Sequence, residues 1–152
     1  MTDGFSQRIQ NGNGCVSTKY TFSPTGEMDR SNCYYDKSNS NLVCAKGTGV
    51  QVRNRPGVFD VSFQNGSSTT NRYTIMGTIG SFRNGFTGMA VYTCSTVSST
   101  QARESVFILG RQNSMSDNDF RILSSSIRRN FIFLAPDNQL KKTDQTGCTY
   151  QE

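Results

Sequence analysis

Apolar and polar side chains alternate along most of this chain, in short segments separated by turn residues. In residues 15–23, which read CVSTKYTFS, every second side chain would lie on one face of an extended strand and the rest on a wetter face. Residues 57–63 (GVFDVSF) repeat the pattern, with large apolar side chains at alternate positions. A period of two is typical of strands that bury one face, so the pattern favours an all-β fold.

Turn-forming Pro, Gly and Asn residues divide the alternating segments into a series of hairpins. We expect strands at residues 15–23, 28–36, 42–53, 57–63, 72–79, 86–94 and 104–111, and a polar loop at residues 95–103. Sequential hairpins predict an up-and-down antiparallel sheet of about seven to eight strands, which closes into a barrel or packs on another sheet.

The period changes once, toward the C-terminus. Ser116, with Asp119 three residues later, is typical of a helix start, and apolar residues follow at helical spacing. We expect one α-helix at residues 116–130, packed on the outside of a barrel, and then a short strand near residues 139–143.

The composition limits the partners and the chemistry of the chain. Its net charge is +5, which favours anionic ligands or partners in general. The basic residues are scattered and lack the aromatic interleaving of single-strand-binding proteins, so we expect no nucleic-acid partner. No run approaches the roughly 18 apolar residues of a membrane span. Histidine is absent, which removes the usual general base and most zinc sites, so we expect no catalytic residue, no cofactor and no metal.

The five cysteines are widely spaced and form no CxxC pair, which indicates structural disulfides and an oxidising compartment. Cys33 and Cys44 lie equally far from the expected turn, so they face each other across a hairpin. They form either a cross-strand disulfide or two buried free thiols. Asn65 begins an Asn-Gly-Ser glycosylation sequon, a common triplet that adds little support for secretion. The first fourteen residues, MTDGFSQRIQNGNG, lack the apolar segment of a signal peptide.

Three stretches of the chain resemble the lipocalin family, nearest to its apolipoprotein D-like group with insect and crustacean relatives. FSQRIQNGNGCVSTKYTF resembles the family's lid loop and second strand, and MAVYTC resembles the end of the seventh strand. ESVFILGR, the expected helix and LKKTDQTGC resemble the eighth strand with its signature arginine, Arg111, the wall helix and the cysteine tail. The resemblance implies one domain over residues 1–152, with 1–14 a remnant of the lid loop, 15–111 the barrel strands, 116–130 the helix, and 131–152 a short strand and tethered tail.

By the same resemblance, Cys15 pairs with Cys148 and holds the tail against the barrel. The family's first strand carries a Gly-x-Trp motif, and this chain has no tryptophan. We therefore expect a shortened lipocalin, or else a natural variant with fewer strands, in which Cys94 is a free thiol and Arg111 lacks its aromatic partner. Strand edges left open in this way predict self-association.

A lipocalin barrel is a cup whose inner face is set by strand parity. The resemblance implies an extracellular carrier of a small hydrophobic ligand, such as a retinoid, fatty acid, sterol, pigment or pheromone, in an apolar cup with a few hydroxyls. The alternatives are an interior filled by its own side chains, and a secreted module that binds proteins through its mouth loops. The candidate ligand-binding residues are those expected to face inward: Val16, Thr18, Tyr20, Phe22, Tyr34, Val43, Phe59, Val61, Phe63, Met89, Val91 and Thr93.

Overall fold

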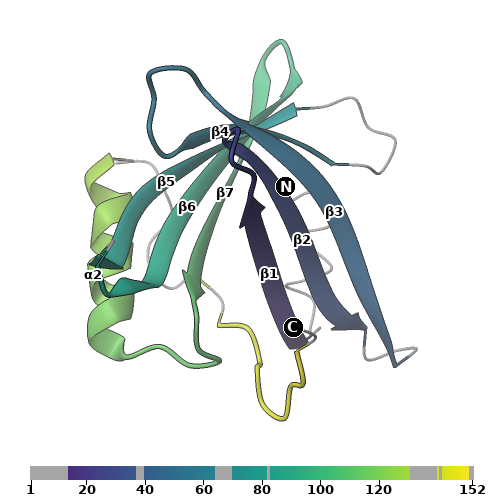
Figure 1. Cartoon of the computed structure of the whole chain (residues 1–152), viewed down its shortest axis with the longest axis vertical. Helices are drawn as coiled ribbons and strands as arrows, with labels where there is room; N and C mark the ends of the chain where they lie inside the picture. Colours follow the sequence, from purple (N-terminus) through teal and green to yellow (C-terminus); the bar gives the residue numbers. More distant parts are fainter. Residues whose placement is uncertain are drawn as a thin grey trace.

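The computed structural model describes residues 14–36, 40–63, 70–81, 83–130, 140 and 142–150. These residues form one seven-stranded antiparallel sheet, in which each strand pairs with the next one along the chain, followed by a single helix (Figure 1). The elements are β1 (Gly14–Phe22), β2 (Glu27–Asp36), β3 (Asn41–Gln51), β4 (Val58–Phe63), β5 (Thr70–Ser81), β6 (Gly85–Ser98), β7 (Gln101–Gly110) and α2 (Asp117–Asn130). The expected up-and-down antiparallel architecture with one late helix is confirmed.

The predicted polar loop at residues 95–103 is wrong. β6 continues to Ser98 and β7 begins at Gln101, so the turn between them is only Ser99 and Thr100. Threonine and valine suit extended backbone, and two neighbouring strands that keep pairing satisfy the backbone groups that a loop would leave to water. The short strand expected near residues 139–143 is not seen at the described positions 140, 142 and 143, and its remainder lies outside the described residues.

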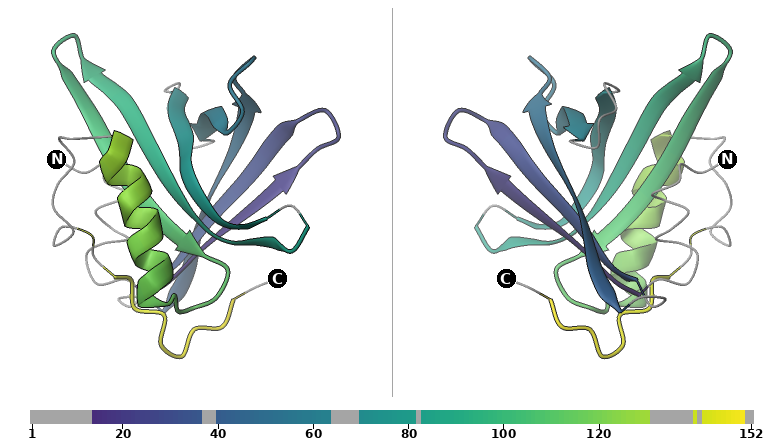
Figure 2. Two further views of the ribbon diagram at one scale, coloured as in Figure 1. Left: turned by 90° about the vertical axis from the view of Figure 1, so that its left-hand side faces the viewer. Right: turned by 90° about the vertical axis from the view of Figure 1, so that its right-hand side faces the viewer.

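The sheet curls strongly without closing on itself (Figures 1 and 2). Within the described part of the chain, β1 and β7 are the two edge strands and do not pair with each other. The tail hydrogen-bonds to the outer edge of β1 at Cys15 and Val16, but no described strand pairs with either edge, and unpaired edges can recruit further strands. The self-association expected from the sequence stays a prediction.

Helix α2 lies against the outer surface of β5, β6 and β7 (Figure 2). The side-chain oxygen of Ser116 accepts a hydrogen bond of 3.1 Å from the Asp119 backbone N–H, which caps the helix as the sequence predicts. The apolar stripe of the helix buries Leu123 and Ile127 against Ala90 of β6. Within the described residues, no helix has the length and hydrophobicity needed to cross a membrane.

Two disulfides fasten the other side of the sheet. Cys33 and Cys44 are bonded across β2 and β3, and Cys15 at the start of β1 is bonded to Cys148 in the tail. The Cys15 backbone N–H also donates to the carbonyl of Asp144 at 2.9 Å, so the tail is held beside β1 by more than the covalent bond. The alternative of two free thiols at the hairpin is wrong, and Cys94 is a half-buried free thiol, as expected.

Candidate functional site

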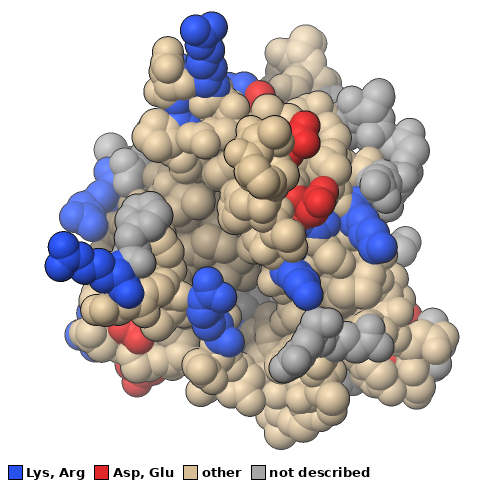
Figure 3. Space-filling model, in the orientation of Figure 1, with Lys and Arg blue, Asp and Glu red and all other residues tan. Residues whose placement is uncertain are grey.

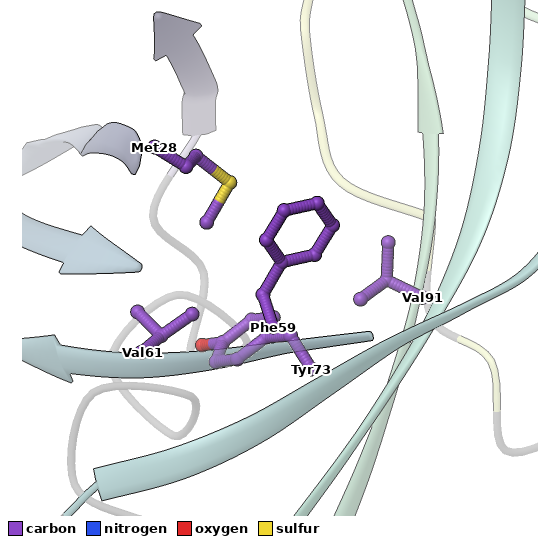
Figure 4. Packing of buried hydrophobic residues seen from close by; sticks show 5 residues of the cluster. All are labelled: Met28, Phe59, Val61, Tyr73 and Val91. Atoms are coloured by element: carbon purple, nitrogen blue, oxygen red, sulfur yellow. The ribbon is translucent and has the colours of Figure 1, made fainter. Parts of the chain in front are cut away.

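The concave inner face of the sheet gathers a cluster of buried side chains from four strands. Figure 4 shows the Phe59 ring between Met28 and Val61 on one side and Val91 on the other, with Tyr73 beside it. Val61 is completely buried. Strand parity positions this cluster, because Phe59 and Val61 alternate along β4 with Asp60 and Ser62, which point to the opposite face. Apolar residues of the two ends of the sheet therefore meet inside its curve.

Glycines on β3 make room for this cluster. A Cβ atom on Gly49 would lie 2.6 Å from the Met28 Cε atom, and a Cβ atom on Gly47 would lie 2.8 Å from the backbone oxygen of Ser62 and 3.1 Å from the Phe63 ring. The 2.6 Å and 2.8 Å distances are too short for real Cβ atoms, so β3 contributes backbone rather than side chains at these two positions of the inner face. Larger side chains from β2 and β4 fill that space.

Several candidate ligand-binding residues lie on the inner face where the sequence placed them. Tyr34 is buried opposite Val43, because the neighbouring disulfide between Cys33 and Cys44 faces outward. Three more residues contact the buried cluster while keeping some exposure, namely Tyr20, Phe63 and Met89. Phe22 is 57% exposed at the end of β1, although its ring centroid is 6.0 Å from that of Phe59.

The remaining candidates are placed by register. Thr18 lies across from Asn32 of β2, and Thr93 lies across from Tyr73 of β5, on the same face as the cluster. Val16 lies at an irregularity in the β1–β2 pairing, where its carbonyl accepts a hydrogen bond of 2.8 Å from Gln145 of the tail. That any of these residues binds a ligand stays a prediction.

Arg30 is an inner-face residue that the sequence analysis missed. It is only 5% exposed, and its Nε atom donates a 2.8 Å hydrogen bond to the side-chain oxygen of Asn32, which is also buried. Its guanidinium carbon lies 4.4 Å from the ring centroid of Tyr73, 5.5 Å from that of Phe63 and 5.6 Å from that of Tyr20. The interior is therefore not apolar with a few hydroxyls, as the sequence analysis expected. It holds a cation stacked among three aromatic rings.

The positive charge of Arg30 has no negatively charged partner among the described residues. Among the described residues no carboxylate lies within ion-pair distance of it, and its Nη1 atom is buried without a hydrogen-bond partner. The ion pair between Arg72 and Asp60, at 2.8 Å, lies on the opposite face of the sheet. Burial raises the pKa of the Tyr20 hydroxyl, an effect that Arg30 opposes by lowering it and Tyr73 reinforces. Tyr20 thus remains an uncharged phenol at neutral pH and cannot serve as a counterion.

The other sequence-predicted sites lie away from the inner face. Arg111 is exposed, and its Nε atom donates to the Phe86 carbonyl. Tyr92, which the sequence did not single out, lies in register opposite Val106 on the outer face; it donates a hydrogen bond to Glu104, and burial and that bond raise its pKa. Asn65 lies outside the described residues. In the described segments, no group of three or more metal-ligating side chains occurs.

Comparisons with known proteins identify the fold. No known family matches the sequence, and no curated protein matches it. Among solved structures, lobster apocrustacyanin A1 superposes with a TM-score of 0.70 at 17% sequence identity, over 96% of this chain and 73% of that protein. This likeness shows that the chain has the lipocalin fold. The apolipoprotein D-like subgroup and the missing first strand stay predictions.

Proposed function

We propose that this chain is an extracellular carrier that holds a small hydrophobic molecule against the inner face of its curled sheet. The observation that carries this proposal is the character of that face, where aromatic, aliphatic and methionine side chains from every strand except β3 converge. Several of them, including Met89, Phe107 and Leu109, are only partly buried. Apolar surface that remains accessible on a concave face is what a lipid-like molecule requires.

The shape of the surface supports the same function. Figure 3 shows a hollow near the centre of the molecule, in the region where Figure 1 shows the gap between β1 and β7. A guest that entered there would reach the inner face without separating paired strands. We expect it to be of the retinoid, fatty acid, sterol, pigment or pheromone type.

Secretion is supported by the cysteines. Four of the five cysteines form two disulfides, and disulfides persist in oxidising compartments. The fold similarity to apocrustacyanin is consistent with carriage rather than catalysis.

Native mass spectrometry of the purified protein, together with titration of the neutral dye Nile red, tests the proposal. We expect a co-purified lipid-like mass, or dye binding that Met89→Asp weakens at least about tenfold by placing a charge in an apolar site. Val50→Asp is the matched control, because Val50 is 58% exposed and lies across from Asp60 on the outer face. Absence of both ligand and dye binding would instead support a filled interior and a module that binds proteins through its loops.

A further inference from the structure

We propose that Arg30 and Asn32 form an anion-binding subsite on the inner face, so that the preferred ligand is an amphipathic carboxylate. Its carboxylate would accept hydrogen bonds from these two side chains, and its apolar body would lie along the neighbouring hydrophobic surface. This inference rests on the carrier function proposed above and narrows it to one chemical class.

The unpaired donor is the first reason. A buried polar group without a partner costs free energy, and more so when it is charged. Arg30 is 5% exposed, and its Nη1 atom has no hydrogen-bond partner. The Nε atom is committed to the Asn32 side-chain oxygen at 2.8 Å, and this leaves the NH₂ group of Asn32 as a second donor. The two donors belong to side chains that contact each other, and each can donate to a carboxylate oxygen.

The second reason is the position of the aromatic rings around the guanidinium. Tyr73, Phe63 and Tyr20 surround the guanidinium at 4.4–5.6 Å from its carbon atom. Aromatic faces attract a cation, but they accept no full hydrogen bond from its N–H groups. The rings therefore favour keeping Arg30 charged inside the sheet, but they leave its buried Nη1 atom without the hydrogen bond that an oxygen ligand would supply.

The third reason is the sequence of side chains along β2. Met28, Arg30 and Asn32 occupy successive inner-face positions, and register places Phe22, Tyr20 and Thr18 of β1 across from them in the same order. The inner face thus changes from apolar at Met28 to polar at Asn32, with Arg30 at the boundary. A molecule that spans this boundary must itself have an apolar part and a polar end.

The test compares a long-chain carboxylate with its neutral ester. Oleate and methyl oleate are titrated into the protein by displacement of Nile red. We expect the wild type to bind oleate at least about tenfold more tightly than methyl oleate, the size of one charge-assisted hydrogen bond. Arg30→Met should remove this preference by weakening oleate much more than methyl oleate. Arg72→Met, which removes an exposed cation on the outer face, should leave the preference intact and so controls for net charge.

A second variant covers the case in which Arg30→Met fails to fold. Asn32→Asp keeps the shape of the side chain and supplies Arg30 with an internal carboxylate, so it should also abolish the preference for oleate. Equal affinity of the wild type for oleate and methyl oleate would overturn this subsite while leaving the carrier function standing. A preference that survives in Arg30→Met or Asn32→Asp would overturn it too. If neither compound displaces Nile red from the wild type, the subsite fails, whereas the carrier function fails only if the dye does not bind and no lipid-like mass co-purifies.

Discussion

The outer face of the sheet is stabilised in different ways at its two ends. At the C-terminal end, β5 to β7 carry apolar outer side chains, and helix α2 covers them so completely that Leu123 and Ala90 have no exposed surface. At the N-terminal end, the disulfide between Cys33 and Cys44 joins two strands, and that between Cys15 and Cys148 fastens the tail.

The difference follows from the side chains that the outer face carries at each end. Hydrophobic burial stabilises in proportion to the apolar area removed from water. On the outer face of β1 to β3, charged residues such as Lys19 and Lys46 stand among apolar ones such as Val50, which stay exposed. Covalent bonds stabilise without burial, because they restrict the unfolded chain. One continuous sheet thus relies on a packed helix at one end and on disulfides at the other.

The largest expected effect comes from removing the disulfide of the tail. Its cysteines are 133 positions apart, and a loop of that length corresponds to about 5 kcal/mol of unfolding free energy. Cys15→Ala combined with Cys148→Ala should lower the stability by about this amount in denaturant titrations. Amide hydrogen exchange should rise throughout the sheet, because amides that open only on global unfolding follow the lowered stability, and β1 should in addition open locally.

The hairpin disulfide provides the internal comparison. Its cysteines are 11 positions apart, so Cys33→Ala with Cys44→Ala should cost less, about 3 kcal/mol. An equal or larger loss from the short loop would contradict the chain-entropy explanation. Opening of β1 that is no easier than in the wild type when the tail disulfide is removed would contradict the view that this bond fastens that end of the sheet.

The next effect concerns the helix-covered face. Leu123→Ala should lower the free energy of unfolding by about 2–5 kcal/mol, because it removes apolar contacts and leaves a cavity. Thermal or denaturant unfolding measures the loss. Ile122→Ala is the matched control, since Ile122 is 47% exposed on the same helix and should change stability by less than about 1 kcal/mol. Similar losses in the two variants would show that α2 does not seal this face.

The smallest effect on stability is expected between β4 and β5, where the two ends of the sheet join. The hydrogen bond from Arg72 lowers the pKa of Asp60 and links β4 to β5. A lowered pKa in the folded state stabilises above the unfolded pKa, and the contribution is lost as the pH falls through the folded value. The unfolding midpoint of the wild type should fall slightly as the pH drops through the pKa of folded Asp60. Asp60→Asn should remove this small pH dependence. Because the pair is exposed and solvent-screened, a change as large as that of Leu123→Ala would mean that the junction, rather than either end, controls stability.

Strand parity correctly predicted which residues face inward where that depends only on the alternation within their own strand. The outward position of Cys33 and Cys44 correctly placed Tyr34 inside. The alternation with polar Asp60 and Ser62 placed Phe59 and Val61 inside as well. Continued along β2, the same parity would also have brought Arg30 inward. An arginine suggests an exposed position when only its own strand is considered, because charged side chains are seldom fully buried without partners.

What could not be predicted depends on several strands at once. Arg30 is acceptable in the interior because Tyr20, Phe63 and Tyr73 reach it from β1, β4 and β5, and no local pattern encodes that convergence. The extension of β6 and β7 through residues 95–103 depends likewise on each strand supplying hydrogen bonds to the other. A stretch rich in serine and threonine gives little apolar alternation by which a strand could be detected.

The rings around Arg30 give the protein an optical signal of its own. The chain has six tyrosines and no tryptophan, so tyrosine dominates its intrinsic ultraviolet emission. Tyr20 and Tyr73 lie against the guanidinium, and the pKa of Tyr20 is raised by burial. A molecule that enters the inner face changes the surroundings of these two chromophores, whereas Tyr150 in the tail stays exposed. Occupancy can therefore be read from unlabelled protein, by the quenching or shift of its emission.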